Sequence, residues 1–373
     1  MPAHVCHITT IHPSRDVRIF HKECKSLAKA GYEVTLVVVN GESFEEDGVK
    51  VIGVPCHFSG RLQRFQKAAK AAYQIAVKID AGIYHFHDPE FLPYAVKLAG
   101  KGKKVLYDVH EDLPRQMLSK HWIPKPVRKV MAFLTENWEN RHSKKMTHII
   151  TATDFIRDRF LKLNTDVTPV KNFPVLPEHE PEFNWNKKQN KISYVGSIAG
   201  VRGISELIRA LSICKADITL NLAGTFSPPS YKNELAGEKG WDRVNVVGYA
   251  GRDKVKELLG RSFAGMVTLH PIINYLDALP VKMFEYMAAG IPVIASDFPL
   301  WRQIVDDAEC GICVDPLKPE AIAEAIDFLN LNPEKAETMG KRGQHAVYRK
   351  YNWQKEEKKL LEVYSTLEQK YLR

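Results

Sequence analysis

Short apolar runs alternate with amphipathic helical segments along most of the chain, and this alternation constrains the fold more than any other feature of the sequence. Its first instance places a strand at His4–Thr9, a helix at about Val17–Lys29 and a strand at Glu33–Val39. In that helix, apolar residues recur at helical spacing and predict one buried stripe: Val17, Phe20, Cys24, Leu27 and Ala28. Strands separated by helices predict a parallel sheet with both faces covered.

The alternation pauses once, at 170–191, where the chain is rich in Pro, Asn and charge and has no periodicity. Further strands are expected near 49–54, 82–86, 103–109, 147–152, 191–197, 217–223, 244–247, 263–269 and directly after Gly290. Helices are expected near 61–79, 91–100, 123–145, 204–214 and 252–260. We therefore expect an α/β protein with two doubly wound domains, at 1–171 and 172–352.

Composition agrees with two soluble domains of ordinary size, since 45% of the 373 residues are hydrophobic and 26% are charged. No run of eighteen apolar residues occurs, and "MPAHVCHITT" lacks the layout of a signal peptide, so we expect a cytoplasmic protein. The six cysteines are too scattered for a disulfide framework. Cys310 and Cys313 form a lone CxxC in an expected strand at Gly311–Val314, so a structural role is expected for them.

The net charge of +9 lies in the first half of the chain, where residues 1–171 hold 27 basic against 18 acidic side chains. Residues 61–145 alone hold 17 against 8 and include "RLQRFQKAAKAAYQIAVKI" and "KHWIPKPVRKVMAFLTENW", which mix basic with aromatic and aliphatic residues. One hypothesis is a peripheral position on anionic lipids at the inner face of a membrane. The alternative is a solvated basic face over core-packed aromatics. No nucleic-acid-binding motif accompanies the charge, so nucleic acid is not an expected partner.

The stretch "NYLDALPVKMFEYMAAGIPVIASD", residues 274–297, predicts a helix that begins near Pro280 and ends at Gly290. Two faces are expected on this helix, one turned to the core (Val281, Phe284, Met287 and Ala288) and one elsewhere (Lys282, Glu285, Tyr286 and Ala289).

The start of this helix has two oddities that a bound anion would explain. No Ser, Thr, Asp or Asn directly precedes Pro280, and Lys282 opposes the helix dipole, which costs about 0.3–1 kcal/mol at a typical site. Free N–H groups and a lysine would both suit a phosphate. The alternative is a surface ion pair between Lys282 and Glu285, with Asp277 as a cap.

A second candidate is "YVGSIAGVRGISELIRAL", which runs from a strand through Gly196, Gly200 and Gly203 into a helix. Small residues let a backbone approach a ligand closely, and Arg202 can contact two phosphate oxygens. Glycines are also common at ordinary strand-to-helix turns, and that reading stays open.

In the first half, polar residues cluster where three expected strands end, in "TTIHPSRDVRIFHKE", "YHFHDPE" and "YDVHED". The residues concerned are Arg15, Asp16, Arg18, His21, His87, Asp88, His110 and Glu111. The carboxyl ends of parallel strands are where ligands bind in open α/β sheets, although each residue alone also suits an ordinary turn. No metal-binding spacing and no GxSxG motif occurs, so neither a metal centre nor a serine nucleophile is expected.

Together these segments make the chain resemble the family 4 glycosyltransferases of the GT-B architecture. That family has an acid, seven residues, a glutamate and a helix like "EAMAxGxPVVAS"; here Asp277 and Glu285 have that spacing and "EYMAAGIPVIAS" follows. The resemblance implies two Rossmann-like domains facing a central cleft. "VKNFP" resembles the hinge, and the amphipathic tail at about 353–373 resembles the helix that crosses back to the first domain. Its apolar residues need a surface to pack on: Trp353, Leu360, Leu361, Tyr364 and Leu367.

The resemblance also implies roles for individual residues. Glu285 would bind the ribose hydroxyls, Asp277 the donor sugar and His110 would lie beside the reaction centre. Arg202 matches one basic phosphate-binding position, whereas Ser197 replaces the other and Lys282 is expected to supply the charge. The implied sets are catalytic (Asp277, Glu285, His110, Arg202), donor-binding (Gly196, Ser197, Arg202, Ala278, Leu279, Lys282, Glu285) and acceptor-side (Arg15, Asp16, His87, His110, Glu111).

The implied function is retaining transfer of a hexosyl or N-acetylhexosaminyl group from a nucleoside diphosphate sugar, with neither metal nor other cofactor. The acceptor would be a glycan, expected to be lipid-linked, in surface polysaccharide or glycoconjugate synthesis. Two other classes fit the same ligand: a sugar-nucleotide epimerase of similar two-domain fold and a non-catalytic sugar-binding protein.

Overall fold

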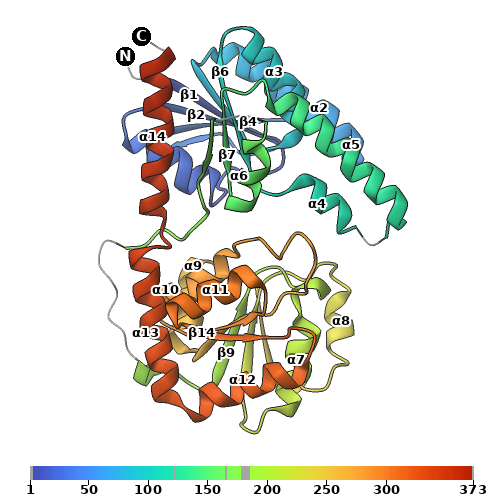
Figure 1. Ribbon diagram of the computed structural model, residues 1–373, viewed down its shortest axis with the longest axis vertical. Helices are drawn as coiled ribbons and strands as arrows, with labels where there is room; N and C mark the ends of the chain where they lie inside the picture. Colours follow the sequence, from blue (N-terminus) through green and yellow to red (C-terminus); the bar gives the residue numbers. More distant parts are fainter. Residues whose placement is uncertain (1–2, 121, 164–165, 178–184, 372–373) are drawn as a thin grey trace. The chain divides into compact units, whose positions relative to one another are not determined.

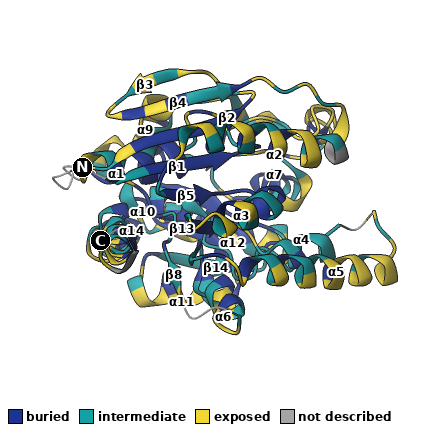
Figure 2. Ribbon diagram, turned by 90° about the horizontal axis from the view of Figure 1, so that it is seen from above, coloured by how far each residue is buried: buried dark blue, intermediate teal, exposed yellow. Residues whose placement is uncertain are grey.

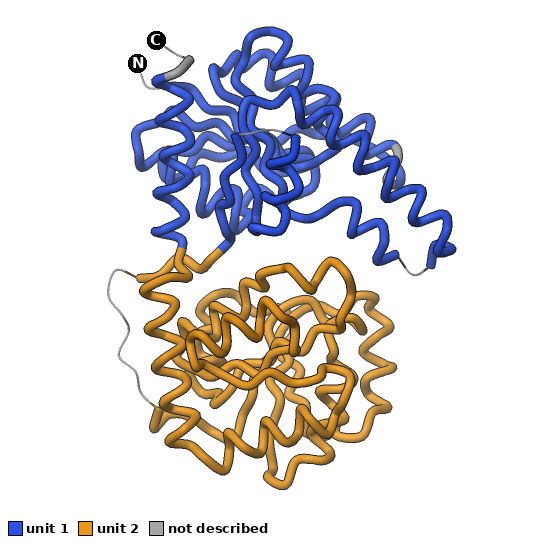
Figure 3. Tube along the Cα trace, in the orientation of Figure 1, with its two compact units in different colours: residues 1–172, 353–373 blue, residues 173–352 orange. Residues whose placement is uncertain are grey.

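The computed structural model describes residues 3–120, 122–163, 166–177 and 185–371. The chain divides into two compact units (Figure 3). Unit 1 contains residues 1–172 and 353–373, and unit 2 contains residues 173–352. The middle of the expected linker, residues 178–184, lies outside the described residues.

Unit 1 is built on an eight-stranded sheet in the order β3-β4-β2-β1-β5-β6-β7-β8 (Figure 1). Its strands are β1 His4–Thr9, β2 Glu33–Val39, β3 Phe44–Glu46, β4 Val49–Val54, β5 Ile83–Phe86, β6 Lys104–Val109, β7 His148–Thr151 and β8 Val167–Pro169. Neighbouring strands are parallel except for the edge pair β3–β4. The buried runs, such as the six buried residues that follow Glu33 in β2, agree with a sheet covered on both faces.

Two helical layers cover this sheet. One face packs on α2 Gly60–Ile79, α3 Leu92–Gly100 and α6 Asp154–Leu161. The other packs on η1 Ile19–Cys24, α1 Lys25–Lys29 and α14 Trp353–Tyr371. The remaining helices of unit 1 are η2 Pro89–Phe91, α4 Leu113–Leu118 and α5 Lys125–Ser143. Burial follows these layers, since β1 and β5 are buried whereas much of α5 is exposed (Figure 2).

Unit 2 has a six-stranded parallel sheet in the order β11-β10-β9-β12-β13-β14. Its strands are β9 Lys191–Val195, β10 Thr219–Ala223, β11 Val244–Gly248, β12 Ala264–Val267, β13 Val293–Ser296 and β14 Gly311–Val314. Its helices are η3 Trp185–Lys187, η4 Gly200–Arg202, α7 Ile204–Ile213, α8 Tyr231–Leu235, η5 Trp241–Arg243, α9 Arg252–Arg261, α10 Val281–Ala288, α11 Pro299–Ala308, α12 Pro319–Leu331 and α13 Pro333–Arg349. One core lies under α7, α8 and α12, and the other under α9, α10, α11 and α13.

In each sheet the strand order reverses direction at one point. That point lies between β1 and β5 in unit 1, and between β9 and β12 in unit 2. Crossovers leave to opposite sides there, so the loops after the two strands separate and leave room for a ligand at the carboxyl edge. The expected α/β class with two Rossmann-like sheets is confirmed.

Three local expectations were wrong or incomplete. The helix expected from Val17 begins at Ile19 with a π-helical turn, and Val17 is exposed rather than part of the buried stripe. Asp16 explains this start, because its Oδ1 accepts the N–H groups of Arg18 and Ile19 at 2.8 and 2.9 Å. The short elements β3 and α4 were not predicted, since three and six residues give too little periodicity to detect. Helices α6, α11, α12 and α13 were not predicted either, although α12 and α13 are 13 and 17 residues long.

No helix within the described ranges is long and apolar enough to cross a membrane.

The packing of α10 on β12 generates a stability prediction. A Cβ added to Gly265 would lie 2.2 Å from Cδ2 of the Tyr286 ring, which is fully buried. We expect Gly265→Ala to lower the free energy of unfolding by about 1–3 kcal/mol, because the ring must move to admit the methyl group. Urea denaturation measures the change.

Gly260→Ala is the matched control. Gly260 is exposed in α9 with nothing within 4 Å of an added Cβ, so alanine should raise the free energy of unfolding by about 0.5–1 kcal/mol. Equal effects of the two substitutions would contradict the packing argument.

Candidate functional site

The carboxyl edge of the unit 2 sheet brings two loops together. The first follows β9 through Gly196 and Arg202, and the second follows β12 through His270. The His270 N–H donates to the Val201 carbonyl oxygen at 3.0 Å. Gly203, at φ +70°, allows this approach, because a Cβ there would lie 1.8 Å from the Thr268 carbonyl oxygen.

Two cations lie on aromatic rings at this edge. The Lys282 Nζ lies 3.7 Å from the centroid of the Tyr194 ring, and the Arg202 guanidinium lies 4.8 Å from that of Tyr275. Burial and the positive charge of Arg202 hold the pKa of Lys282 well below its ordinary value, against the opposite effect of Glu285. The structure therefore brings Arg202, Lys282 and Glu285 into one electrostatic group, and an anion would relieve the repulsion between the cations.

The same nitrogen borders the expected glycine loop. A Cβ on Gly196 would lie 3.0 Å from the Lys282 Nζ, and Gly196 has φ +131°. Lys282 is thus packed beneath the β9 loop instead of lying on an open surface, which disfavours a simple surface ion pair with Glu285. Ser197, next in the loop, is exposed.

Helix α10 starts as the sequence predicts, with Pro280 at the N-cap and no side-chain cap from that residue. Its first turn contains no acidic residue, and the N–H groups of Val281 and Lys282 lie where helices leave donors without intrahelical partners. Asp277 and Leu279 lie half-buried in the preceding loop.

The backbone of Ala278 holds that loop in place through two hydrogen bonds. Its N–H donates to the Tyr275 carbonyl oxygen at 3.1 Å, and its carbonyl oxygen accepts from the Trp301 Nε1 at 2.7 Å. Both backbone groups of Ala278 are therefore engaged, so the donors left for an anion at this turn are those nearer Val281.

One residue of α10 was assigned to the wrong face. Tyr286 was grouped with Lys282 and Glu285, yet it is fully buried and its hydroxyl accepts the Val195 N–H at 2.9 Å. This bond ties α10 to the end of β9. The core side of α10 is correspondingly wider than the expected stripe, because Met283 is buried as well.

Sequence reasoning missed a histidine–glutamate pair beside the Arg202 loop. The His270 Nε2 lies 3.0 Å from the Glu206 Oε2. Burial raises the pKa of Glu206, but the hydrogen bond and charge of His270 outweigh this and leave it lowered. The only hint was a histidine directly after an apolar strand, a signal too common to single it out.

The carboxyl edge of the unit 1 sheet holds a polar network around Asp88. The Asp88 Oδ2 accepts from the Thr9 hydroxyl at 2.8 Å and from the Thr10 N–H at 2.6 Å. The His12 ring lies between Asp88 and Asp16, at 3.5 and 3.4 Å. Burial lowers the pKa of His12, but these carboxylates outweigh it and raise that pKa above 6.5.

Behind this network, Arg18 is buried and makes two hydrogen bonds of 2.8 Å to the two oxygens of Asp108. Asp108 also lies 2.8 Å from the His110 Nε2 and 3.2 Å from the His87 Nδ1. His87 is buried, so it supports His110 from behind and does not line a surface with it.

The other acceptor-side candidates, Arg15 and Glu111, contact different partners. Arg15 is exposed, pairs with Glu46 and lies 4.0 Å from the centroid of the Phe44 ring. Glu111 is also exposed and accepts a hydrogen bond from Gln116.

Potential metal ligands meet once within the described parts of the chain. Glu23, His85, His87 and Asp108 offer atoms within 4.8 Å of one another. Arg18 already contacts both carboxyl groups, at 3.0 Å to Glu23 and 2.8 Å to Asp108, so a cation there would face a fixed positive charge. That no metal is needed stays a prediction.

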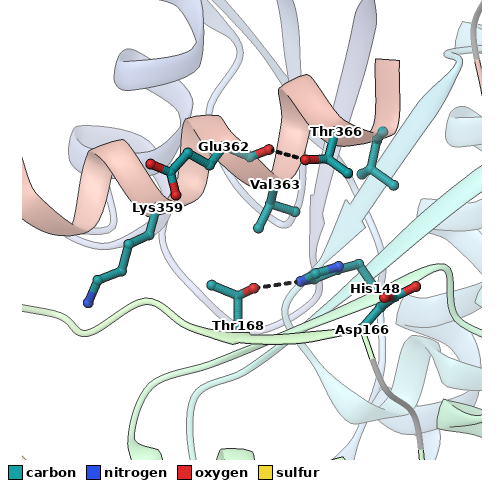
Figure 4. A pocket seen from close by; sticks show the side chains of 8 residues that line it. His148, Asp166, Thr168, Lys359, Glu362, Val363 and Thr366 are labelled. Atoms are coloured by element: carbon teal, nitrogen blue, oxygen red, sulfur yellow. Dashed lines mark hydrogen bonds between the residues drawn. The ribbon is translucent and has the colours of Figure 1, made fainter. Parts of the chain in front are cut away.

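A hollow of about 280 Å³ lies elsewhere in unit 1 (Figure 4). It is lined by His148, Asp166, Thr168, Lys359, Glu362, Val363, Thr366 and Leu367. His148 and Asp166 lie at the amino ends of β7 and β8, at the opposite edge of the sheet from His110. Topology therefore separates this hollow from the candidate site.

Two family models match the chain. Residues 17–173 match the model described as Glycosyltransferase Family 4, and residues 176–346 match the model described as Glycosyl transferases group 1.

Curated relatives are similar over part of their length. The lipopolysaccharide glucosyltransferase WaaG of Escherichia coli is 29% identical over 38% of this chain and 37% of its own. The D-rhamnosyltransferase WbpZ of Pseudomonas aeruginosa is 23% identical over 74% of this chain and 70% of its own. The alignments span between 37% and 50% of the first three relatives, which include the alpha-D-kanosaminyltransferase of Streptomyces kanamyceticus.

Solved structures share the fold. A sucrose-phosphate synthase from Thermosynechococcus elongatus has a TM-score of 0.75 at 18% identity, over 98% of this chain and 99% of its own. The Anabaena protein HepE, solved with UDP and glucose, has a TM-score of 0.70 at 14% identity, over 98% of this chain and 100% of its own.

The closeness of Arg202 and Lys282 predicts that the charge of Lys282 lowers the stability of the ligand-free protein while favouring anion binding. Lys282→Met keeps the alkyl packing and removes the charge, so we expect the free energy of unfolding without ligand to rise or to stay within about 0.5 kcal/mol. Because the pKa of Lys282 is lowered on folding, the unfolded chain binds more protons at this site than the folded protein does. The loss of stability caused by burying Lys282 therefore becomes smaller as the pH rises towards 10.5. Denaturation of both proteins across that pH range measures this.

Lys256→Met, on the exposed side of α9, is the control and should show no such pH-dependent difference. A loss of more than 1 kcal/mol for Lys282→Met at neutral pH would show that the ammonium group stabilises the fold, for example through its contact with Tyr194.

Proposed function

Because the chain belongs to the family 4 glycosyltransferases and has the GT-B fold, we propose that it transfers a sugar from a nucleoside diphosphate sugar to a glycan with retention at the anomeric carbon. The observation that carries this proposal is the pair of cations, Arg202 and Lys282, beside the amino end of α10. Two positive groups and a helix terminus match the two phosphates of a diphosphate.

Residue-to-residue similarity to the family motif supports the roles that we propose for the donor-binding residues. Glu285 lies one turn after Lys282 on α10 and interacts with it electrostatically. Glu285 binds the ribose hydroxyls, and Asp277 binds hydroxyls of the transferred sugar. Gly196, Ser197 and Leu279 contribute backbone and small side-chain surface around the diphosphate. That HepE was solved with UDP and glucose supports a donor of this class.

Bond breakage places negative charge on the departing diphosphate, so stabilising that charge is the main demand on the protein. Arg202, Lys282 and the first N–H groups of α10 are fixed before the reaction, which avoids reorganisation when the charge develops. The leaving phosphate takes the acceptor proton on the face of attack. No metal or other cofactor is required in this scheme.

The acceptor side is assigned to unit 1, at the edge that holds His110 and Asp16. His110 lies nearest the reacting sugar, while Arg15 and Glu111 serve the outer part of an extended acceptor. The names of the relatives include glucosyl-, rhamnosyl- and kanosaminyl-transferases, so we propose a hexosyl or N-acetylhexosaminyl group.

Exposed apolar side chains on α5 favour a lipid-linked acceptor in surface polysaccharide or glycoconjugate synthesis. They are Val127, Val130, Met131, Phe133 and Leu134, with Trp122 just before the helix, and they are 36–73% exposed. Within α5 they recur at helical spacing on one face, and soluble proteins rarely leave so much contiguous apolar surface open.

Basic residues accompany this face. Lys125 and Lys129 are exposed on the same half of α5, and the first acid in the helix is Glu136. Apolar groups with flanking lysines match the interface of an anionic bilayer. We therefore propose a peripheral position on the cytoplasmic face of a membrane, with the α5 face as the contact.

Donor binding is testable by thermal shift against UDP, GDP, ADP and their sugars, with and without EDTA. Ligand at a hundred times Kd stabilises the folded state by about 2.7 kcal/mol. We expect a shift with one nucleotide class, unaffected by EDTA, that Glu285→Ala and Arg202→Ala abolish or sharply reduce. Arg202→Ala should also lower kcat by about 10²–10³-fold.

Arg252→Ala and Glu324→Ala, exposed on α9 and α12, are the controls and should keep the full shift. Unchanged shifts in folded Glu285→Ala and Arg202→Ala would contradict the donor assignment. Formation of epimerised free sugar without an acceptor would favour the epimerase. A thermal shift with a nucleotide sugar, but no release of nucleotide with any acceptor tested, would favour a binding protein.

Membrane binding is testable by flotation with anionic and zwitterionic vesicles. We expect salt-sensitive flotation with anionic vesicles only. Trp122→Ser with Phe133→Ser should weaken binding by at least about ten-fold, since the loss of each buried aromatic contact exceeds about 1.4 kcal/mol.

Leu331→Ser, which removes a 65% exposed leucine of unit 2, is the matched control and should float like the unmodified protein. No binding to anionic vesicles would remove the membrane proposal. Self-association that the double variant abolishes would instead assign the α5 face to a second copy of the chain.

A further inference from the structure

A buried polar layer crosses the first sheet close to its carboxyl edge. On the face covered by η1 and α14, Val5, Ile83 and Leu106 are apolar core residues. Two residues further along the three strands, the same face carries His7, His85 and Asp108, all fully buried. The carboxyl edge therefore rests on a continuous set of ionisable groups, which needs a complete account of its hydrogen bonds.

The contacts form one chain. From Asp108, the Oδ2 lies 3.2 Å from the His87 Nδ1, and the His87 Nε2 lies 3.0 Å from the His7 Nδ1. The His7 Nε2 lies 3.3 Å from the Tyr364 hydroxyl, which lies 2.8 Å from the His85 Nδ1. The His85 Nε2 lies 3.9 Å from the Glu23 Oε2.

Asp108 sets the direction of every bond in this chain. Burial would raise its pKa, but the Arg18 charge and the contacts from His110 and His87 hold that pKa well below the ordinary value. An ionised carboxylate only accepts hydrogen bonds. The His110 Nε2, 2.8 Å from this carboxylate, must therefore carry a hydrogen. The His87 Nδ1 lies 3.2 Å from both the Asp108 Oδ2 and the His110 Nε2. Because the His110 hydrogen is already donated to Asp108, we assign a hydrogen to the His87 Nδ1 as well.

The remaining hydrogens then follow one after another. The His87 Nε2 accepts from the His7 Nδ1–H, and the His7 Nε2 accepts from the Tyr364 O–H. The Tyr364 oxygen accepts from the His85 Nδ1–H, which leaves the His85 Nε2 as an acceptor facing a protonated Glu23. Burial raises the pKa of Glu23 and lowers that of His7, His85 and His87, so this arrangement holds neutral rings throughout.

The nearby His12 does not compete for His110. The His12 ring nitrogens face Asp16 and Asp88, at 3.4 and 3.5 Å, and its raised pKa agrees with a charged ring held by carboxylates. The His110 side chain is 18% exposed, so its second ring nitrogen can meet a ligand.

We propose that Arg18 and Asp108 are positioning residues that fix His110 as the Nε2–H tautomer, so that its bare Nδ1 accepts a hydrogen bond from a ligand hydroxyl. Such a ring recognises the O–H of a sugar and cannot donate to a phosphate or carbonyl oxygen. Only the identity of the ligand hydroxyl depends on the proposed function. The tautomer of His110 depends on the buried hydrogen bonds alone.

Two-bond ¹H–¹⁵N correlation spectra of the full chain, labelled at histidine, test the tautomer directly. We expect the neutral ring of His110, identified by the signals lost in His110→Gln, to carry hydrogen on Nε2 and none on Nδ1. A neutral His110 ring with hydrogen on Nδ1 would overturn the proposal without reference to any activity.

Two variants distinguish the role of Asp108 from that of the remaining residues in the chain of hydrogen bonds. Asp108→Asn should change the tautomer or mobility of His110, whereas Tyr364→Phe should shift His7 and His85 and leave the His110 tautomer as it is. The reverse pattern would contradict the assigned direction. If Asp108→Asn does not fold, the spectrum of the unmodified protein still decides.

Kinetics give a second readout if sugar transfer is found. Asp108→Asn should lower kcat/KM by about a hundred-fold, because the acceptor geometry at His110 is lost, with nucleotide binding to unit 2 unchanged. Absence of transfer would defeat the proposed function alone, and a normal kcat/KM in Asp108→Asn would defeat the positioning role.

Discussion

Parallel strand pairing is the constraint on which both units depend. A parallel neighbour can be reached only by a crossover that returns the chain to the starting edge, so every loop that follows a strand lies at the same edge. Of the strands described, only β3 departs from this pattern. The loops after β9 and β12 therefore meet at one edge of unit 2, and those after β1, β5 and β6 meet at one edge of unit 1. Each candidate site is first a consequence of topology and only then of side-chain chemistry.

The two edges handle charge in different ways. In unit 1, the charge of buried Arg18 is compensated by the ionised Asp108 inside the protein, and Asp108 also contacts the surrounding histidine rings. In unit 2, Arg202 and Lys282 share one region and burial disfavours the charge on Lys282. The first arrangement compensates its own charge, whereas the second would gain from an anion, which agrees with the proposed donor site.

The sequence predicted the α/β class, the positions of most long elements and the uncapped start of α10, because these depend on local periodicity and on residues such as Pro280 and Gly290. It did not predict what depends on contacts between distant segments. Tyr286 was placed on the wrong face because helical spacing cannot tell that a ring will lie against Gly265. Arg18 read as one of several turn residues, since nothing in its neighbourhood indicates a partner ninety positions away at Asp108. The roles of the site residues remain predictions.

Because α14 belongs to unit 1, the core of unit 1 is complete only after the end of the described chain has been synthesised. It contributes Trp353 and Tyr364 to a core otherwise formed by residues that precede 172, and the Tyr364 hydroxyl meets His7 across 357 positions of chain. The first unit to leave the ribosome therefore remains open on one sheet face until the whole of the second unit has been translated. During that interval His7, His85 and the apolar residues around them are uncovered, so a nascent chain needs either rapid completion or a chaperone over that face. Loss of α14 would leave unit 1, and not the unit that directly precedes the helix, without a finished core.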